Sequence, residues 1–179
     1  MSRVAYQGEP GSFSHEACLA MRPWDEPVAF PTFEAAVAAV KSGDCGCAMI
    51  PVESDRTGAI EPAARLVETS GLRQMAEAWR PFRLHLAGVA DALLEGVRTA
   101  ESHPVALAQC TRAIRSLNLK PVEAEDTAGA ARAVAEAEDR TRAAICSSTA
   151  AELYGLRILK SDVEDNPGVR LRFVVLCDN

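Results

Sequence analysis

Short apolar runs alternate with longer alanine-rich stretches along the chain, and this alternation restricts the possible fold more than any other feature. The apolar runs are rich in Val, Ile and Phe, which is typical of strands. The alanine-rich stretches carry helix-start and helix-stop residues. Strands are predicted at residues 3–7, 27–30 and 45–52, in one or two pieces of 74–90, in a run ending at 101–103, at 143–148 and at 172–176. Helices are predicted to begin near Ser14, Thr32, Pro62, Pro104 and Thr127, and a last one ends at Gly155. This pattern predicts an α/β fold with mostly parallel sheets.

The alternation occurs twice, around residues 1–73 and 98–158, which predicts two lobes. A chain of 179 residues is long enough to bury a core in each lobe. The final strand could return to the first lobe, so that the chain crosses between the lobes twice. We therefore expect lobe 1 to contain residues 1–78 and 160–179 and lobe 2 to contain 79–159, with a ligand-binding cleft between them.

The charge balance excludes some classes of function. The chain carries 19 basic and 25 acidic residues, a net charge of −6. This argues against a nucleic-acid-binding protein or one that binds a membrane surface, although a small anion needs only local positive charge. The N-terminus has no apolar signal core, and there is no apolar run of about 18 residues. We therefore expect a cytoplasmic protein.

The six cysteines lie mostly in apolar runs of small residues. Only Cys45 and Cys47 are close together, and neither a nearby histidine nor a second cysteine pair completes a zinc spacing. We expect six buried free thiols in a reducing cytosol, and no metal.

The segment YQGEPGSFSHEA, at residues 6–17, runs from a strand through a glycine-rich turn into a helix. Backbone N–H groups around Gly11, with the hydroxyls of Ser12 and Ser14, are typical of an anion site at a helix N-terminus. The alternative is a plain turn in which Ser14 only caps the helix. The glycine spacing does not match a dinucleotide-binding fingerprint.

Other polar residues follow predicted strands or begin predicted helices. Glu53, Ser54 and Thr57 come directly after a buried strand, where ligands bind in open α/β sheets, and Glu53 could accept or donate a proton. The alternative is a solvated turn with Thr57 capping the next helix. Two further junctions carry Ser102, His103 and Thr127. Together these junctions predict a cleft that holds a small anion through amide and hydroxyl donors.

Six segments, in order along nearly the whole chain, resemble the motifs of the prephenate dehydratase family. They are GEPGSFSHEA, IPVESDRTGAI, SHPVALAQC, EDTAGAARAVAE, AAICSSTAAELYGL and VEDNPGVRLRFVVL. The resemblance implies a two-lobed fold like that of periplasmic binding proteins, with the active site between the lobes. It also implies a lyase that converts prephenate to phenylpyruvate, with loss of water and carbon dioxide, in phenylalanine biosynthesis.

The resemblance further implies a small dicarboxylate substrate, no metal or organic cofactor, and a homodimer. Most family members continue into a regulatory ACT domain of about 80 residues, and we expect no such domain within this sequence.

The family's closing N-x-T-R-F motif is altered. Without a gap, Val169 stands at the Asn position and Leu171 at the position of the Thr, which is the family's presumed proton donor. A leucine side chain cannot donate a proton. Arg172 matches the family's Arg and is expected to bind a carboxylate or brace the cleft. Arg170 is an additional cation, interpreted either as a second ligand for the substrate or as a solvated residue.

Two more polar positions of the family differ: Ser54-Asp55 replaces Asn-Ser, and Val105 replaces Gln. Three functions therefore stay open. The first is a dehydratase in which Glu53, Ser54 or Thr57 assists the leaving hydroxyl. The second is a decarboxylase that keeps the hydroxyl, and the third is a non-catalytic protein that binds a small anion. The predicted catalytic positions are Glu53, Ser54, Leu171 and Arg172. The predicted substrate-binding residues are Gly11, Ser12, Ser14, Thr57, Ser102, His103, Thr127 and Arg170.

Overall fold

The computed structural model describes residues 2–178, which form two compact units. Unit 1 contains the residues up to Glu9, Phe13–Phe82 and the residues from Val169 onward. Unit 2 contains Pro10–Ser12 and Arg83–Gly168. Within the described residues, no helix has the length and apolar character needed to span a membrane.

Apart from the short loop Pro10–Ser12, the chain crosses between the units at Phe82/Arg83 and at Gly168/Val169, later than the expected crossings after residues 78 and 159. Two contacts in unit 2 account for the later return. The strand Arg157–Lys160 pairs with His85–Gly88, and the Val163 N–H donates to the Leu84 carbonyl at 2.8 Å.

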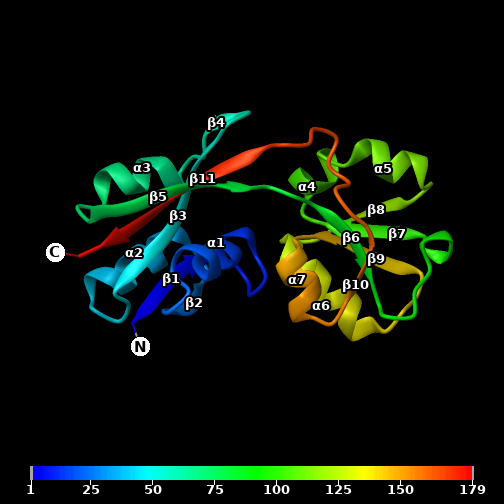
Figure 1. The fold of residues 1–179 in the computed structure, drawn as a ribbon, viewed down its shortest axis with the longest axis horizontal. Helices are drawn as coiled ribbons and strands as arrows, with labels where there is room; N and C mark the ends of the chain where they lie inside the picture. The colour runs from blue at the N-terminus through cyan, green and yellow to red at the C-terminus, as the bar shows by residue number, and fades with distance from the viewer. Residues whose placement is uncertain (1, 179) are drawn as a thin grey trace. The chain divides into compact units, whose positions relative to one another are not determined.

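Unit 1 is built on one mixed sheet with the strand order β2-β1-β3-β11-β5, in which β4 also pairs with β3 (Figure 1). Strand β1 is parallel to β2 and β3, whereas β11 is antiparallel to both β3 and β5. The strands are β1 Arg3–Gln7, β2 Glu26–Phe30, β3 Cys47–Ser54, β4 Gly58–Ala59, β5 Arg73–Pro81 and β11 Arg170–Cys177. The helices are α1 Phe13–Met21, α2 Phe33–Lys41 and α3 Ala63–Thr69.

Unit 2 is built on a second mixed sheet, with the order β10-β6-β9-β7-β8. Strand β7 is parallel to β8 and β9, and β6 is antiparallel to β9 and β10. The strands are β6 His85–Gly88, β7 Thr99–Ser102, β8 Lys120–Glu123, β9 Arg142–Cys146 and β10 Arg157–Lys160. The helices are α4 Pro104–Ala108, α5 Thr111–Ser116, α6 Thr127–Ala137 and α7 Ser148–Leu153, with a short 3-10 helix at Leu94–Gly96.

The predicted α/β fold is confirmed, but the prediction of mostly parallel sheets is wrong. The chain leaves unit 1 after β5 and returns through β11, so these neighbouring strands run in opposite directions. Strand β11 is buried on both faces between Phe173 and Leu176. A strand buried on both faces has a continuous apolar sequence whatever the direction of its neighbours, so the sequence pattern could not distinguish the two cases.

The two faces of the β3–β11 pair carry the core of unit 1. Val174 and Leu176 pack with residues of α2 and α3 on one face. Phe173 and Val175 pack with Tyr6 and with residues of α1 on the other. In unit 2, α6 and α7 pack with β9 in an alanine-rich core.

The helix predicted to begin at Pro104 is broken into α4 and α5. The break is stabilised by Asp165, a residue from the segment that leads back to unit 1. Its carboxylate accepts hydrogen bonds from the N–H groups of Thr111 and Arg112 and from the Thr111 hydroxyl. A cap supplied 54 residues away leaves no local signal in the sequence.

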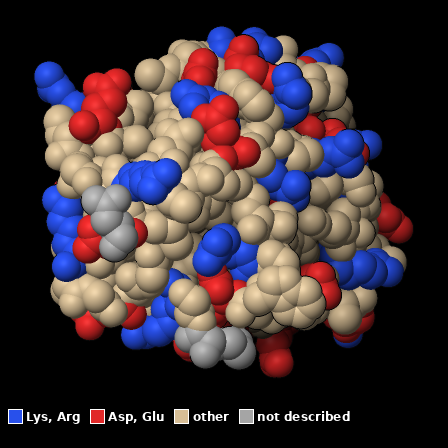
Figure 2. Space-filling view, turned by 60° about the vertical axis from the view of Figure 1, so that its left-hand side comes forward, with Lys and Arg blue, Asp and Glu red and all other residues tan. Residues whose placement is uncertain are grey.

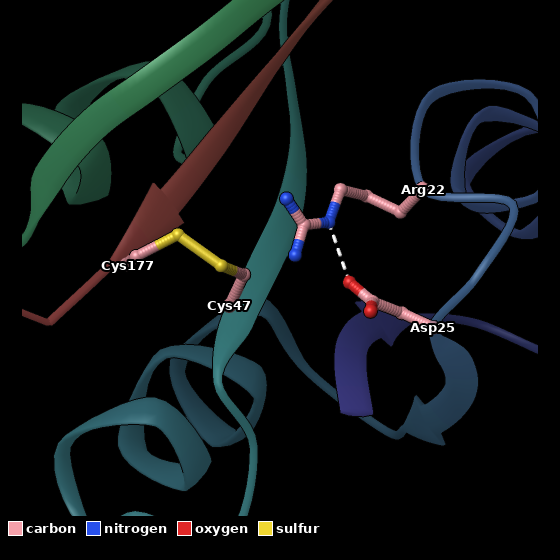
Figure 3. The surroundings of a disulfide bond; sticks show 4 residues. All are labelled: Arg22, Asp25, Cys47 and Cys177. Atoms are coloured by element: carbon pink, nitrogen blue, oxygen red, sulfur yellow. Dashed lines mark hydrogen bonds and ion pairs between the residues drawn. A yellow bond between two sulfur atoms is a disulfide. The ribbon is translucent and has the colours of Figure 1, made fainter. Parts of the chain in front are cut away.

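The expectation of six free thiols is wrong for two cysteines. Cys47 and Cys177 are direct partners in the β3–β11 ladder and form a disulfide (Figure 3). Their Cα atoms are 4.3 Å apart, close to the spacing of about 4.5 Å in non-hydrogen-bonded antiparallel pairs. The two residues are 130 positions apart, so only the fold brings them together. In the described part of the chain, the remaining four cysteines are buried and free: Cys18, Cys45, Cys110 and Cys146.

Figure 2 shows one face of the molecule, on which basic and acidic side chains are intermixed.

Candidate functional site in the β3–β11 ladder

The end of the β3–β11 ladder brings together the predicted catalytic residues. Leu171 lies directly opposite Ser54, and Arg172 directly opposite Glu53. Directly opposed residues of an antiparallel pair project to the same face of the sheet, and neighbours along a strand project to opposite faces. The four residues therefore form two pairs on opposite faces rather than one cluster.

An irregularity in the ladder allows this pairing. The next partner of β11 after Arg172 is Phe173, which pairs with Pro51, so Val52 has no direct partner. This extra residue in β3 shifts the alternation, as in a β-bulge. Glu53 thereby reaches the face that carries Arg172 and Val174, where these residues line a hollow of about 320 Å³ beneath α3.

Arg172 joins three strands through two carboxylates. Its Nε donates to Glu53 Oε2 at 2.9 Å, and its NH1 group donates to Glu77 Oε2 on β5, also at 2.9 Å. Burial alone would lower the pKa of the Arg172 guanidinium, but the hydrogen bonds to the two carboxylates outweigh it and raise that pKa. In this arrangement Arg172 braces β3, β11 and β5.

Arg170 is bound at the very end of the same ladder. Its backbone N–H donates to Asp55 Oδ1 at 2.9 Å and its Nε donates to Asp55 Oδ2 at 3.1 Å. The guanidinium also lies 5.6 Å from the centre of the Trp79 ring. The hydrogen bond from the Arg170 backbone is the main cause that lowers the pKa of Asp55. This cation is therefore paired within unit 1 rather than simply solvated.

Ser54 occupies the turn that follows β3, on the face of Leu171. Its Oγ accepts from the N–H groups of Arg56 at 3.3 Å and Thr57 at 3.4 Å, so the hydroxyl proton remains available to another acceptor. Ser54 is only 6% exposed, whereas Thr57 is exposed. Thr57 does not cap the next helix, because α3 begins at Ala63 with Pro62 before it.

The loop between β1 and α1 has a packing role in unit 2. Gly11 has a φ of +95°, and a Cβ added there would lie 2.8 Å from Ala150 Cα, so only glycine fits. Ser147 Oγ donates to the Gly11 carbonyl and the Tyr154 hydroxyl to the Pro10 carbonyl, both at 2.7 Å. These contacts attach Pro10–Ser12 to α7.

The remaining predicted binding residues also have local structural roles. Ser102 is fully buried, and its Oγ donates to the Ile145 carbonyl at 2.6 Å. His103 caps α4, since its Nδ1 accepts from the Val105 N–H at 3.1 Å. Thr127 is the first residue of α6, whose N-cap is Asp126. Ser14 is buried within α1.

The predicted residues are thus divided between the two units. Those of the β3–β11 ladder, with Ser14 and Thr57, belong to unit 1, and five others belong to unit 2. They are Gly11, Ser12, Ser102, His103 and Thr127. A shared cleft stays a prediction. The sequence did not reveal that Asp55 pairs with Arg170, 115 residues away, or that Glu77 pairs with Arg172, 95 residues away.

Comparison with known proteins identifies the family. The family model described as "Prephenate dehydratase" matches residues 4–179. A bifunctional N-acyl-homoserine lactone acylase/prephenate dehydratase of Komagataeibacter europaeus is 36% identical over 96% of this chain and 61% of that protein. Arogenate dehydratase/prephenate dehydratase 1 of Arabidopsis thaliana is 34% identical over 97% of this chain, but over only 44% of its own length.

A solved structure shows the same fold. The prephenate dehydratase of Arthrobacter aurescens, determined in complex with L-Phe, superposes with a TM-score of 0.88 at 24% identity, over 99% of this chain and 60% of that chain. The resemblance seen in the six sequence motifs is therefore confirmed, and the chain belongs to the prephenate dehydratase family.

Proposed function

We propose that this chain is a lyase that converts prephenate to phenylpyruvate, with loss of water and carbon dioxide. Membership of the family supports this reaction class. The observation that carries the proposal for this chain is the placement of Ser54 directly opposite Leu171. A hydroxyl is then available one strand away from the position where the family has its Thr.

The reaction needs a proton, or a strong hydrogen bond, on the hydroxyl that leaves prephenate. Directly opposed side chains in an antiparallel ladder have Cβ atoms about 5 Å apart, so Ser54 could reach much of the space that a Thr at position 171 would reach. Two backbone N–H groups hold its oxygen, and hydrogen bonds of this kind polarise one another. The low exposure of Ser54 strengthens a hydrogen bond to a bound substrate.

Glu53 is a weaker choice for this proton. Its carboxylate is bound by Arg172, on the face opposite to Leu171. The exposed Thr57 hydroxyl lies three residues beyond Ser54 and offers a matched comparison.

The experiment compares Ser54→Ala with Thr57→Val in the purified protein, using prephenate at neutral pH. Release of carbon dioxide and the absorbance of phenylpyruvate are followed together. Loss of a positioned proton donor typically lowers the rate about 100-fold or more, so Ser54→Ala should lower kcat by that amount and Thr57→Val should not. Equal rates in the wild type and Ser54→Ala would exclude this role for Ser54.

A second candidate, favoured by Leu171, is a decarboxylase that retains the hydroxyl. Carbon dioxide without phenylpyruvate would support it. Binding of prephenate without either product would support a non-catalytic anion-binding protein. Because relatives bear the names arogenate dehydratase and acylase, two further substrates are tested with their own readouts. Arogenate is followed by carbon dioxide and phenylalanine, and an N-acyl-homoserine lactone by release of the free acid.

A further inference from the structure

We propose that the Cys47–Cys177 disulfide forms and breaks reversibly in the folded protein. A dithiol reductant opens it, and an oxidant of the disulfide class re-forms it, while the rest of the chain stays folded. It lies at the opposite end of the β3–β11 ladder from Leu171 and Ser54. The inference does not depend on which reaction the chain catalyses.

The two sulfur atoms differ in how accessible they are. Cys47 is 5% exposed and packs in the apolar cluster beneath α1, whereas Cys177 is partly exposed at the last position of β11. An attacking thiolate therefore reaches Cys177 more readily, and Cys47 becomes the leaving group. Because Cys47 is buried and a buried thiolate is a poor leaving group, reduction requires local opening of the end of β11.

A cation lies in the surroundings of the disulfide. Arg22, directly after α1, extends its guanidinium towards β3, and its Nε donates to Asp25 Oδ2 at 2.5 Å (Figure 3). The Arg22 N–H also donates to the carbonyl of Cys18, a member of the apolar cluster that contains Cys47. Asp25 pairs with this guanidinium, so the charge beside the apolar cluster is largely balanced.

The other thiols are protected from exchange. Burial raises the pKa of Cys18, Cys110 and Cys146 to about 12. It also raises the pKa of Cys45, which is 3% exposed. A thiol with a pKa near 12 has on the order of one thiolate in 10⁵ molecules at neutral pH. After reduction, Cys47 and Cys177 can therefore re-form their bond without pairing with a different cysteine.

The chemistry balances with a dithiol as the reductant. One thiolate of the reductant attacks Cys177 Sγ, the Cys47–Cys177 bond breaks, and Cys47 leaves as a thiolate that takes up a proton. The second thiolate of the reductant then attacks the mixed disulfide and releases the Cys177 thiolate, which is protonated in turn. The reductant is oxidised to its disulfide, and the two protons from its thiols end on the two cysteines.

Reduction of the disulfide should loosen the end of β11 without unfolding the sheet. Phe173, Val174, Val175 and Leu176 remain buried and paired on both sides. The link closes a loop between residues 130 positions apart, and its removal should lower Tm by about 10 °C. Backbone N–H exchange should increase at positions 176–177 and stay unchanged at 171–173.

The test equilibrates the folded protein in buffers of reduced and oxidised dithiothreitol, with alkylation and peptide mass spectrometry as the readout. We expect reversible labelling of Cys47 and Cys177 alone, with the Tm shift following the same midpoint. A Cys47→Ser/Cys177→Ser double variant should reproduce the Tm of the reduced protein.

Three results would overturn the proposal. One is that the oxidised protein already labels at all six cysteines. Another is that reduction occurs only at the rate of global unfolding. The third is that the four other cysteines label together with Cys47 and Cys177.

Discussion

Leu171 and Arg172 are neighbours in the chain but serve different faces of the sheet. Leu171 packs against the cluster that includes Tyr6 and Phe173, on the side of Ser54. Arg172 turns to the other side, where it joins Glu53 and Glu77. A substitution at position 171 can therefore change the chemistry next to Ser54 and leave the ion pairs of Arg172 intact.

In the Ser54→Ala background, Leu171→Thr should increase the formation of phenylpyruvate from prephenate about 100-fold, the usual contribution of a positioned proton donor. The change removes part of a half-buried apolar side chain and should cost about 1 kcal/mol of stability. Leu171→Val is the matched control, because valine has the shape of threonine without the hydroxyl. Steady-state kinetics decide the question: equal rates for the Thr and Val variants would mean that this position does not contact the leaving group.

At the scale of elements, α5 shows how a distant residue can define a helix. Burial alone would raise the pKa of Asp165, but the hydrogen bonds from Thr111 and Arg112 outweigh it and lower that pKa. A lowered pKa means that folding favours the charged carboxylate. The stabilisation is then fully present above the pKa of about 4 that Asp has in unfolded chains, and it is lost as the pH falls through the lower, folded value.

Asp165→Asn should therefore lower the free energy of unfolding by about 1 kcal/mol at neutral pH, because it removes the negative charge at the start of α5 and one of two acceptor oxygens. The difference from the wild type should shrink as the pH falls through the lowered pKa of Asp165, because the wild-type carboxylate is then protonated too. Urea unfolding of both proteins, from neutral to acidic pH, measures this difference in free energy. A difference that stays constant with pH would show that the negative charge is not what stabilises the start of α5.

The sequence predicted most elements correctly, and the errors share one physical cause. The strands and helices around Thr32 and Gly43 follow from local propensity and capping. The antiparallel direction of β11, the cap at Asp165 and the Cys47–Cys177 bond depend on contacts between residues far apart in the chain. For the candidate site, the sequence located the end of β3 and the β11 strand. It could not show that Glu53 and Ser54 act on opposite faces, because the extra residue at Val52 exists only in the pairing with β11.

At the scale of the whole molecule, the two units differ in how their chain is arranged. Unit 1 is assembled from three separate segments, whereas almost all of unit 2 is the continuous segment 83–168. The second sheet, from β10 to β8, and the helices that cover it are contained in that segment. Only the short loop Pro10–Ser12 comes from elsewhere, and it contributes carbonyl acceptors to Ser147 and Tyr154.

Residues 83–168 should therefore fold without the rest of the chain, with a cooperative urea transition and a dispersed NMR spectrum, because the segment carries its own apolar core. Its stability should be lower than that of unit 2 in the full chain, since Ser147 and Tyr154 lose their partners on the loop. Tyr154→Phe provides the internal control: it should cost about 1 kcal/mol in the full chain and less in the isolated segment, where the Pro10 carbonyl is missing. If 83–168 remained unfolded while the full chain folded normally, the second sheet would have to draw its stability from unit 1, and the division into two self-sufficient cores would be wrong.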